Sequence, residues 1–583
     1  MNPPVNIKRK DLEALCNLFK QNAYSVGYET PAAAEALGKC KALLELDYKV
    51  VEINNSDGTL CAHYPSKILI CQSELPKYGG DGVKNDALNL ESESDVNQLR
   101  NQILKARKGR CRARFPIPVI FYNGKNICRS GTTAHFVEIL GRATVETLNS
   151  YVVGPSEDES EERGDEEEFN DDQNLNLESS VRKNDIQLLK MYNVQSIFDL
   201  MVEQRKVKYG VYVTSSESAD EESRYNDFKI FHIPYPGCEF FTNINHSDKQ
   251  EIKLHFDWTQ KMVDKEFDIP DLEHFSNMLI DWKEYKKWDV TVLTRNYLML
   301  ILKQIHESNS GVLVHCISGW DRTPLFISLI RISLWADGLI HKSLNAWQLM
   351  YFTIAYDWML FGHNLKNRLE KFEEIFFFCF FVLKHLAEFE LTKDGLVYPR
   401  PESRKHDNMF GRSTIRSPTD NNSYLFRDNE TDINEEDLLS DDSDLEHDDL
   451  YEDAPSPPSS NESNGNNMSE PSSDSNGAAS SNPSIPKRSS PVPIQKNNSS
   501  ASDTDTSGSW AYVTTTGSLK NKEEFALEGL REKQYTAGRY YRLHRLRKEF
   551  YRIYFQCIPV NYQMGPSMLG QVLGNLSERV GFT

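Results

Sequence analysis

The chain has no two cysteines separated by two residues and no matching pair of histidines, although it contains ten cysteines. A structural zinc site or a disulfide framework needs such spacings, so neither is expected. Cysteines that occur singly are typically reduced thiols, which indicates an intracellular protein. Each of them is available to react as a thiol or to pack as a small apolar side chain.

Long apolar runs are also missing. The longest one, IFFFCFFVL at residues 375–383, has about half of the roughly 20 residues that a membrane-spanning helix requires. The N-terminus MNPPVNIKRK has proline and charge where a signal peptide needs a continuous apolar stretch. We expect residues 375–383 to form a buried helix, rather than to make shallow membrane contact, and any membrane contact of the protein to be peripheral.

Basic charge is in deficit, because the formal net charge is -20. Two segments account for the deficit. Residues 157–172 carry eleven acidic residues against one arginine, and residues 428–453 carry fourteen acidic residues with no lysine or arginine. Since these segments hold charges of -10 and -14, the rest of the chain is near +4. The folded part therefore tolerates an anionic ligand, despite the acidity of the whole.

Helical and strand patterns alternate between residues 184 and 316. A helical period runs into a short strand near residue 198, the strand candidates KYGVYVT and DFKIFHIPYP follow, and a helical pattern over 289–308 leads into GVLVHC. Such alternation predicts a central, mostly parallel sheet flanked by helices. Residues 402–515 have too few apolar residues to fold, and a helix returns at 522–556.

The stretch GVLVHCISGWDRTPLFISLI, residues 311–330, contains the strongest candidate site. Cys316 ends an apolar strand, Gly319 permits a tight turn, and Pro324 lies near the first turn of the following helical pattern. A C-x5-R match alone is weak evidence, because about half of one such match is expected by chance in a chain of this composition. The loop, however, directs amide groups and a helix dipole to one point, which favours a phosphate dianion and a cysteine thiolate.

These residue types support covalent phosphoryl transfer. Cys316 would attack phosphorus, Arg322 would bind two phosphate oxygens through its planar fork, and Asp321 would protonate the leaving alcohol. This chemistry needs no metal or cofactor, and no nucleic-acid partner is expected. The competing interpretation treats Cys316 as a packed thiol, Trp320 as a packing residue, and Asp321 with Arg322 as an ion pair at a helix start.

At these residues the chain resembles the myotubularin phosphoinositide phosphatases, whose signature is C-S-D-G-W-D-R. A second segment, AYDWMLFGHNL at residues 355–365, is similar to the acidic-Trp-x-x-Phe-Gly-His stretch of that family. The resemblance covers about residues 184–386. It implies a cysteine-phosphatase fold of the dual-specificity or myotubularin type. It also implies removal of the 3-phosphate from phosphatidylinositol 3-phosphate and phosphatidylinositol 3,5-bisphosphate.

The resemblance also implies roles for single residues. It makes Cys316 the nucleophile, Arg322 the phosphate ligand and Asp321 the general acid. The other loop residues would contact substrate, and these are Ile317, Ser318, Gly319 and Trp320. Thr323, whose hydroxyl would stabilise the thiolate, would also contact substrate. Two positions depart from the family, since Ser318 replaces an aspartate and Ile317 a serine, so that the acid role falls more heavily on Asp321.

Two other functions stay open. A protein tyrosine phosphatase would take its acid from a separate loop, at about IPYPGCEFF in residues 233–241, where Glu239 is the acidic residue. A catalytically inactive adaptor that binds phosphoinositides is the second alternative. Inactive members usually lack the cysteine or the arginine, whereas Cys316 and Arg322 are both present.

The resulting prediction divides the chain into five segments. They are a mixed α/β region of unassigned identity at 1–150, an acidic disordered insert at 155–180, a cysteine phosphatase domain at 181–400, a disordered acidic and serine-rich linker at 401–517, and a basic amphipathic helix with a tail at 518–583.

The tail and the last helix carry weaker predictions. Trp510 and Val513, in TDTSGSWAYV, resemble the aromatic-x-x-aliphatic strands that bind autophagy ubiquitin-like proteins by adding to a sheet edge. We expect the basic helix to dock its apolar side on the domain, with a membrane-facing role as the alternative. The resemblance implies a cytoplasmic protein peripherally associated with intracellular membranes, with phosphoinositide lipids as partners and a role in membrane traffic or autophagy.

Overall fold

The computed structural model describes residues 5–76, 82–85, 87–135, 138–139, 171–208, 211–220, 222–243, 254–392, 395–397, 512–513, 519–520 and 522–558. Residues 1–432 and 536–583 belong to one compact unit, and residues 433–535 to another. All of the site described below lies in the first unit. Trp510 and most of the predicted linker lie outside the described residues.

The main sheet has the strand order β3-β4-β10-β6-β9. The pairs β4–β10, β10–β6 and β6–β9 are parallel, and β3 pairs antiparallel with β4 at one edge. This confirms the predicted α/β fold with a mostly parallel sheet. The strands are β3 (Ile117–Tyr122), β4 (Lys125–Gly131), β6 (Val194–Asp199), β9 (Lys229–His232) and β10 (Gly311–Cys316).

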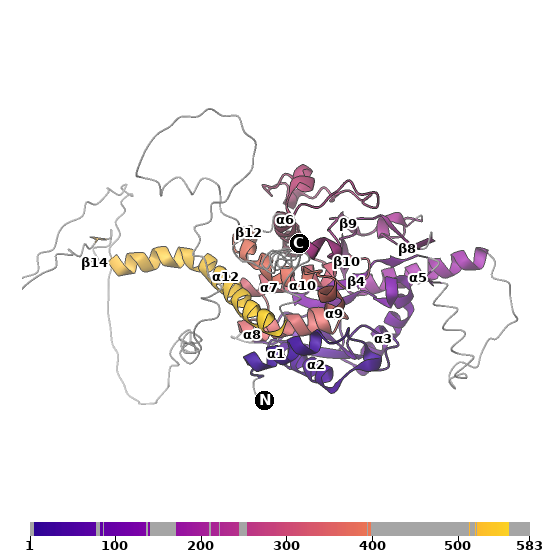
Figure 1. Ribbon diagram of the computed structural model, residues 1–583, viewed down its shortest axis with the longest axis horizontal. Coiled ribbons are helices and arrows are strands. Elements are labelled where there is room, and N and C mark those ends of the chain that lie inside the picture. The colour runs from indigo at the N-terminus through magenta and orange to yellow at the C-terminus, as the bar shows by residue number, and fades with distance from the viewer. Residues whose placement is uncertain are drawn as a thin grey trace, which may run out of the picture. The chain divides into compact units, whose positions relative to one another are not determined.

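Strand β10 is the central strand, and its residues are all buried. Helix α6 (Val290–Glu307) precedes it and helix α7 (Arg322–Ala336) follows it (Figure 1). Asp289 caps α6 by accepting hydrogen bonds from the amides of Thr291 and Val292. Every residue of α7 is buried, which explains why its sequence is apolar all round rather than on one stripe.

The N-terminal region does not form a domain of its own. Its strands β3 and β4 belong to the main sheet, and β4 pairs directly with β10, so the predicted division between residues 150 and 181 separates neighbouring strands. The boundary is therefore corrected. The other elements before residue 135 are α1 (Arg9–Phe19), α2 (Pro31–Leu44), the antiparallel pair β1 (Tyr48–Asn54) and β2 (Lys67–Glu74), α3 (Glu93–Ala106) and β5 (Thr133–Ala134).

The predicted acidic insert also needs correction. Helix α5 (Asp171–Met191) begins inside the range 155–180, and its later residues pack against α3. Residues 155–170 lie outside the described part. In the predicted linker, β13 (Tyr512–Val513) pairs antiparallel with β14 (Leu519–Lys520), so a short hairpin pairing lies where disorder is expected, and Val513 is part of it.

Residues 375–383 are buried, as predicted, in α10 (Ile375–Phe381) and the start of the following 3-10 helix. Helix α12 (Lys522–Cys557) lies where the sequence predicts a helix over 522–556, and its C-terminal part runs beside α10 (Figure 1). The rings of Phe380 and Phe550 stack with their centroids 3.8 Å apart. The apolar side of α12 therefore faces the domain.

The basic side chains of α12 do not all face water. Arg539 is buried and pairs with Asp337 at 2.6 Å, and it also donates to the carbonyl oxygens of Leu386 and Ser333. Its guanidinium thus joins α12 to α7 and to the end of the α10 segment.

The remaining described elements cover the sheet or connect its strands. They are β7 (Arg205–Lys208), β8 (Val211–Ser215), α8 (Ala346–Phe352), the π-helix η8 (Thr353–Met359), α9 (Leu365–Glu370), β11 (Glu390–Thr392) and β12 (Gly395–Val397), with short 3-10 helices between them. Among the described helices, none has the length and apolar character needed to cross a bilayer.

Candidate active site

The predicted loop lies at the carboxyl end of the central strand. Cys316 is the last residue of β10, the loop follows, and Arg322 and Thr323 open α7. In a parallel sheet this edge is where ligands usually bind. The Thr323 hydroxyl donates to the Cys316 sulfur at 3.2 Å, which stabilises negative charge on the sulfur.

Gly319 is the residue that lets the loop turn. Its φ is +66°, and an added Cβ would lie 2.7 Å from the carbonyl oxygen of Ser130. Only glycine combines this backbone conformation with so close an approach. Ser318 and Ile317 are partly exposed, and the Ile317 carbonyl accepts a hydrogen bond from the amide of Thr132 at 3.1 Å.

Two buried arginines, which the sequence interpretation did not identify, hold the Gly319 carbonyl. Arg114 donates to it at 3.2 Å and Arg129 at 3.1 Å. Since a peptide group is planar and trans, the Trp320 amide in the same peptide points away from the two arginines. The arginines therefore fix the direction of one backbone amide of the loop. The RCRAR repeat at residues 110–114 is the signal that could have identified one of them.

Arg322 is anchored by one of its two terminal nitrogens. Its Nη1 donates to the carbonyl oxygens of Leu200 at 2.7 Å and Tyr235 at 2.9 Å. Within the described residues, no protein group accepts from the rest of the fork, which leaves donors for phosphate oxygens. Burial acts to lower the pKa of Arg322, but the nearby Cys316 and acidic residues raise it above its ordinary value, so the group is charged.

Asp321 forms a closed ion pair rather than facing the loop as a free acid. Arg368 donates to its two oxygens at 3.0 and 2.9 Å, and His363 Nδ1 lies 3.0 Å from Oδ1. Burial acts to raise the pKa of Asp321, but His363 and Arg368 outweigh it and hold the pKa well below its ordinary value. In this conformation Asp321 is a carboxylate, so a role as proton donor requires the ion pair to open.

The second family-like segment contacts the loop directly. It forms the π-helix η8 and the turn after it, where Gly362 has a φ of +79°. His363 Nδ1 lies 2.9 Å from the carbonyl oxygen of Trp320, and the Asp357 carbonyl accepts from Arg129 at 2.6 Å. The structure thus brings together two motifs that are far apart in the sequence.

Glu239, the alternative acid, lies in an exposed position of the 3-10 helix η5 (Cys238–Asn243). The same segment supplies the Tyr235 carbonyl that anchors Arg322, and Glu239 contributes to the raised pKa of Arg322. The segment therefore lies beside the loop. No contact between Glu239 and Cys316 is found among the described side chains.

A buried charge network supports the strand below the loop. His315, next to Cys316, lies 2.9 Å from Glu217, and Lys265 contacts Asp199. Burial acts to raise the pKa of Glu217, but the charges of His315 and Arg110 lower it to about 2. Asp199, Glu217 and His315 offer ligand atoms within 4.8 Å of one another, the spacing of a metal site. The ammonium of Lys265 and the guanidinium of Arg110 already balance these carboxylates, so we interpret the cluster as structural.

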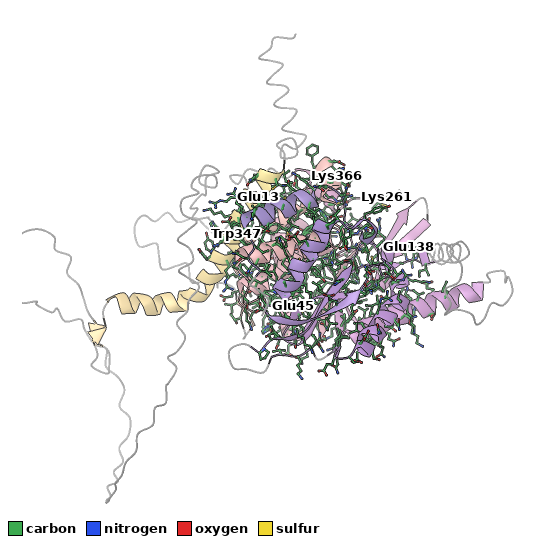
Figure 2. All side chains as sticks on the ribbon, turned by 90° about the horizontal axis from the view of Figure 1, so that it is seen from below. Glu13, Glu45, Glu138, Lys261, Trp347 and Lys366 are labelled. Carbon is green, nitrogen blue, oxygen red and sulfur yellow. The ribbon has the colours of Figure 1, made fainter. Side chains whose placement is uncertain are left out.

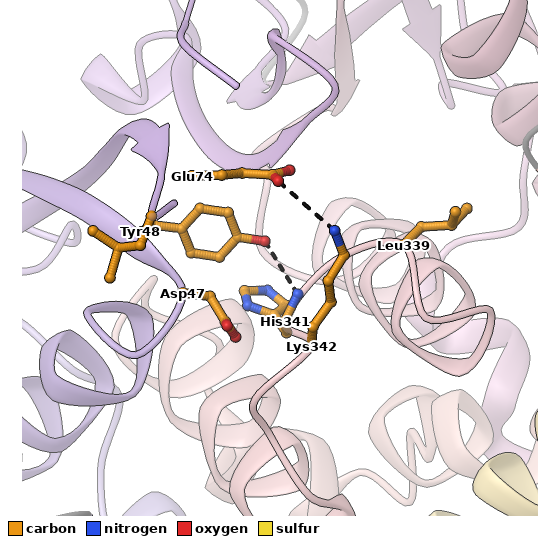
Figure 3. A pocket seen from close by; sticks show the side chains of 7 residues that line it. Asp47, Tyr48, Glu74, Leu339, His341 and Lys342 are labelled. Carbon is orange, nitrogen blue, oxygen red and sulfur yellow. Dashed lines mark hydrogen bonds and ion pairs between the residues drawn. The ribbon is translucent and has the colours of Figure 1, made fainter. Parts of the chain in front are cut away.

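A hollow of about 70 Å³ lies elsewhere in the fold (Figure 3). Its acidic side chains are engaged, because Asp47 accepts from Ser343 and Glu74 pairs with Lys342 at 3.8 Å. Carboxylates at its wall disfavour a phosphate. The residues that line the hollow are Asp47, Tyr48, Glu74, Leu75, Leu339, His341 and Lys342. None of them belongs to the Cys316 loop.

Comparison with known proteins agrees with this geometry. The family described as myotubularin-like phosphatase domain matches residues 96–419. A human protein named phosphatidylinositol-3,5-bisphosphate 3-phosphatase MTMR14 is 45% identical over 359 residues, which are 61% of this chain and 53% of that protein. The mouse protein of the same name is 44% identical over 353 residues, 60% of this chain and 53% of its own length.

A more distant relative is the phosphoinositide 3-phosphatase of Saccharomyces cerevisiae, 31% identical over 91 residues, which are 15% of this chain and 12% of that protein. The chain spans about half the length of the first two relatives. The family match, by contrast, covers more than half of this chain, begins in the region that supplies Arg114 and Arg129, and includes the whole loop. The chain belongs to the myotubularin-like phosphatase family.

Proposed function

We propose that this protein is a phosphoinositide 3-phosphatase that acts on phosphatidylinositol 3-phosphate and phosphatidylinositol 3,5-bisphosphate. The observation that carries the proposal is the loop itself, in which the Cys316 sulfur accepts a hydrogen bond from Thr323 and the nearby Arg322 fork keeps donors that no described residue uses. The names of the relatives supply the substrate class. The presence of both Cys316 and Arg322 argues against an inactive adaptor.

The reaction would take place in two steps. In the first, the Cys316 sulfur forms a bond to phosphorus while the bond from phosphorus to the inositol oxygen breaks, and that oxygen takes a proton from an acid. In the second, water attacks the thiophosphate, releases inorganic phosphate and regenerates the thiol. Arg322 and the loop amides stabilise the equatorial oxygens in both steps.

The proton donor is either Asp321 or Glu239. Asp321 lies within the loop, but its oxygens are occupied by Arg368 and His363, so it would donate only after this ion pair opens. Glu239 is exposed, and no described residue forms an ion pair with it. It lies, however, on a segment separate from the loop. Matched amide substitutions, Asp321→Asn and Glu239→Gln, would separate the two. The substitution of the true donor slows a lipid with an alkoxide leaving group far more than an activated aryl phosphate.

The test of the proposal is a substrate panel. Wild type, Cys316→Ser and Arg322→Ala would be assayed for phosphate release from short-chain forms of the seven phosphoinositides and from a phosphotyrosine peptide. The proposal expects turnover confined to lipids with a 3-phosphate and lost in both variants. Turnover of the peptide alone would favour a tyrosine phosphatase, and turnover of nothing by the wild type would favour an adaptor.

We further propose that the protein works in the cytoplasm, at the surface of intracellular membranes that contain its lipid substrates, and in membrane traffic or autophagy. We also propose that the segment containing Trp510 and Val513 binds an autophagy ubiquitin-like protein. Trp510→Ala should abolish recovery of such a protein in a pull-down, and undiminished recovery would contradict the idea.

A further inference from the structure

Arg112 lies beside the phosphate loop without being part of it. It belongs to the 3-10 helix η3 (Cys111–Ala113), between α3 and β3, and its side chain is exposed. The carbon of its guanidinium lies 4.0 Å from the centroid of the Trp320 ring. A cation at this distance over an indole is attracted by the ring, so a loop residue holds the arginine in place.

The backbone of this turn is strained. Arg112 has a φ of 58° and Ala113 a φ of 55°, two consecutive non-glycine residues in the left-handed region. Each costs about 1–2 kcal/mol relative to an ordinary conformation. The Arg112 amide donates to Glu138 Oε1 at 2.8 Å, and Glu138 is labelled in Figure 2. Strain of this kind is concentrated at ligand sites, where it places a side chain.

The turn is also tied to the phosphate loop through the backbone. The Cys111 amide donates to the Thr132 carbonyl at 2.8 Å, and the Thr132 amide donates to the Ile317 carbonyl at 3.1 Å. Thr132 directly follows β4, whose Gly131 is paired in register with Cys316. The position of Arg112 relative to the nucleophile is therefore set by the sheet.

The guanidinium of Arg112 has no ion pair within the described residues. The Glu138 carboxylate binds the backbone amide of Arg112 instead. The indole nitrogen of Trp320 is buried without an acceptor. Burial lowers the pKa of the neighbouring His63, and the charges of Arg114 and Arg112 lower it further, which indicates a positive local field. An exposed guanidinium that no described carboxylate pairs with, beside this loop, suits a second anion.

We propose that Arg112, stacked on Trp320, binds a second phosphate of the lipid headgroup, distinct from the 3-phosphate held by the loop. This inference rests on the proposed function. A phosphoinositide offers two such groups, the phosphodiester that joins inositol to glycerol and the 5-phosphate of the bisphosphate. The planar fork of Arg112 would donate two hydrogen bonds to either group, and the indole would fix the plane of the fork.

The experiment compares Arg112→Ala and Arg112→Lys with wild type on three substrates: short-chain phosphatidylinositol 3-phosphate, short-chain phosphatidylinositol 3,5-bisphosphate and p-nitrophenyl phosphate. Arg112→Ala should lower kcat/KM by about tenfold on at least one lipid, mainly through KM, because a charge-assisted hydrogen bond is lost. It should change kcat/KM for the aryl phosphate less than twofold, because that substrate has one phosphate only. Arg112→Lys should restore part of the loss.

The matched control is Lys190→Ala. It removes the same charge from an exposed residue of α5, whose ion pair is with Asp227 at 2.8 Å, and it should leave all three substrates unaffected. A loss on the bisphosphate alone would identify the 5-phosphate as the ligand, and an equal loss on both lipids would identify the phosphodiester.

Two results would overturn the inference while the proposed function stands. One is wild-type kcat/KM on both lipids for Arg112→Ala. The other is an equal loss on the aryl phosphate and on the lipids, which would mean that Arg112 only shapes the loop. Failure of the wild type to hydrolyse either lipid would contradict the proposed function first, and the inference with it.

Discussion

Replacing Gly319 with alanine tests whether the shape of the loop depends on a single missing side chain. The added Cβ would approach the Ser130 carbonyl oxygen to 2.7 Å, and the residue would have to keep a φ of +66°. The backbone conformation alone costs about 1–2 kcal/mol for a residue with a Cβ. The neighbouring atom is backbone of β4, so relief requires the loop to move. Because 1.4 kcal/mol corresponds to a factor of ten, we expect kcat/KM to fall by about tenfold or more, with weaker binding of vanadate.

Gly38→Ala is the matched control. Gly38 lies on an exposed position of α2, where an added Cβ meets no atom within 4 Å. Alanine stabilises a helix interior relative to glycine by about 0.5–1 kcal/mol, so this variant should be as stable as wild type or more stable, with unchanged activity. Urea unfolding and steady-state kinetics would be measured for both variants. Wild-type activity in Gly319→Ala would refute the argument about the loop.

Three further predictions concern single contacts. Thr323→Val removes the hydroxyl that donates to the Cys316 sulfur at 3.2 Å, so alkylation by iodoacetamide near pH 7 should slow severalfold; an unchanged rate would contradict the contact's role. Arg539→Met leaves Asp337 buried without its cation and should lower the free energy of unfolding by about 3 kcal/mol, whereas a loss below about 1 kcal/mol would mean that α12 docks mainly through its aromatic residues. The folded-state pKa of Asp321 is below its ordinary value, so its ionised form stabilises the protein above about pH 4, and this contribution is lost as the pH falls toward the folded-state pKa. The unfolding free energy of wild type minus that of Asp321→Asn should therefore be largest near pH 6 and shrink below pH 4, and a difference independent of pH would contradict this.

The strand, turn and helix around Cys316 could be predicted from the sequence because this unit is local. A strand that ends at Cys316, five loop residues and the start of a helix at Arg322 follow one another, and this order places the cysteine and the arginine at the two ends of one short loop. The parallel sheet follows from the alternation of helix and strand for the same reason. Buried aromatic packing at residues 375–383 is likewise evident from a run of apolar residues.

Contacts between distant segments could not be read in this way. Arg114 and Arg129 reach Gly319 across about 200 residues of chain, and only the folded sheet brings them together. The ion pair between Asp321 and Arg368 joins residues 47 positions apart, and together with His363 it lowers the pKa of the residue predicted to be the acid. A sequence shows which residues can ionise, whereas their partners in the fold determine the pKa.

The pairing of β4 with β10 has a practical consequence for anyone who divides this chain. A fragment that starts at residue 181 would keep Cys316 but lose β4, the neighbouring strand on one side of it, together with the two arginines that bind the Gly319 carbonyl. The backbone groups along that side of β10 would be left without partners, an edge prone to self-association. Such a fragment should be insoluble or inactive. In the full chain, we expect enzymatic activity to be lost in the same cooperative transition in which the first third of the polypeptide unfolds.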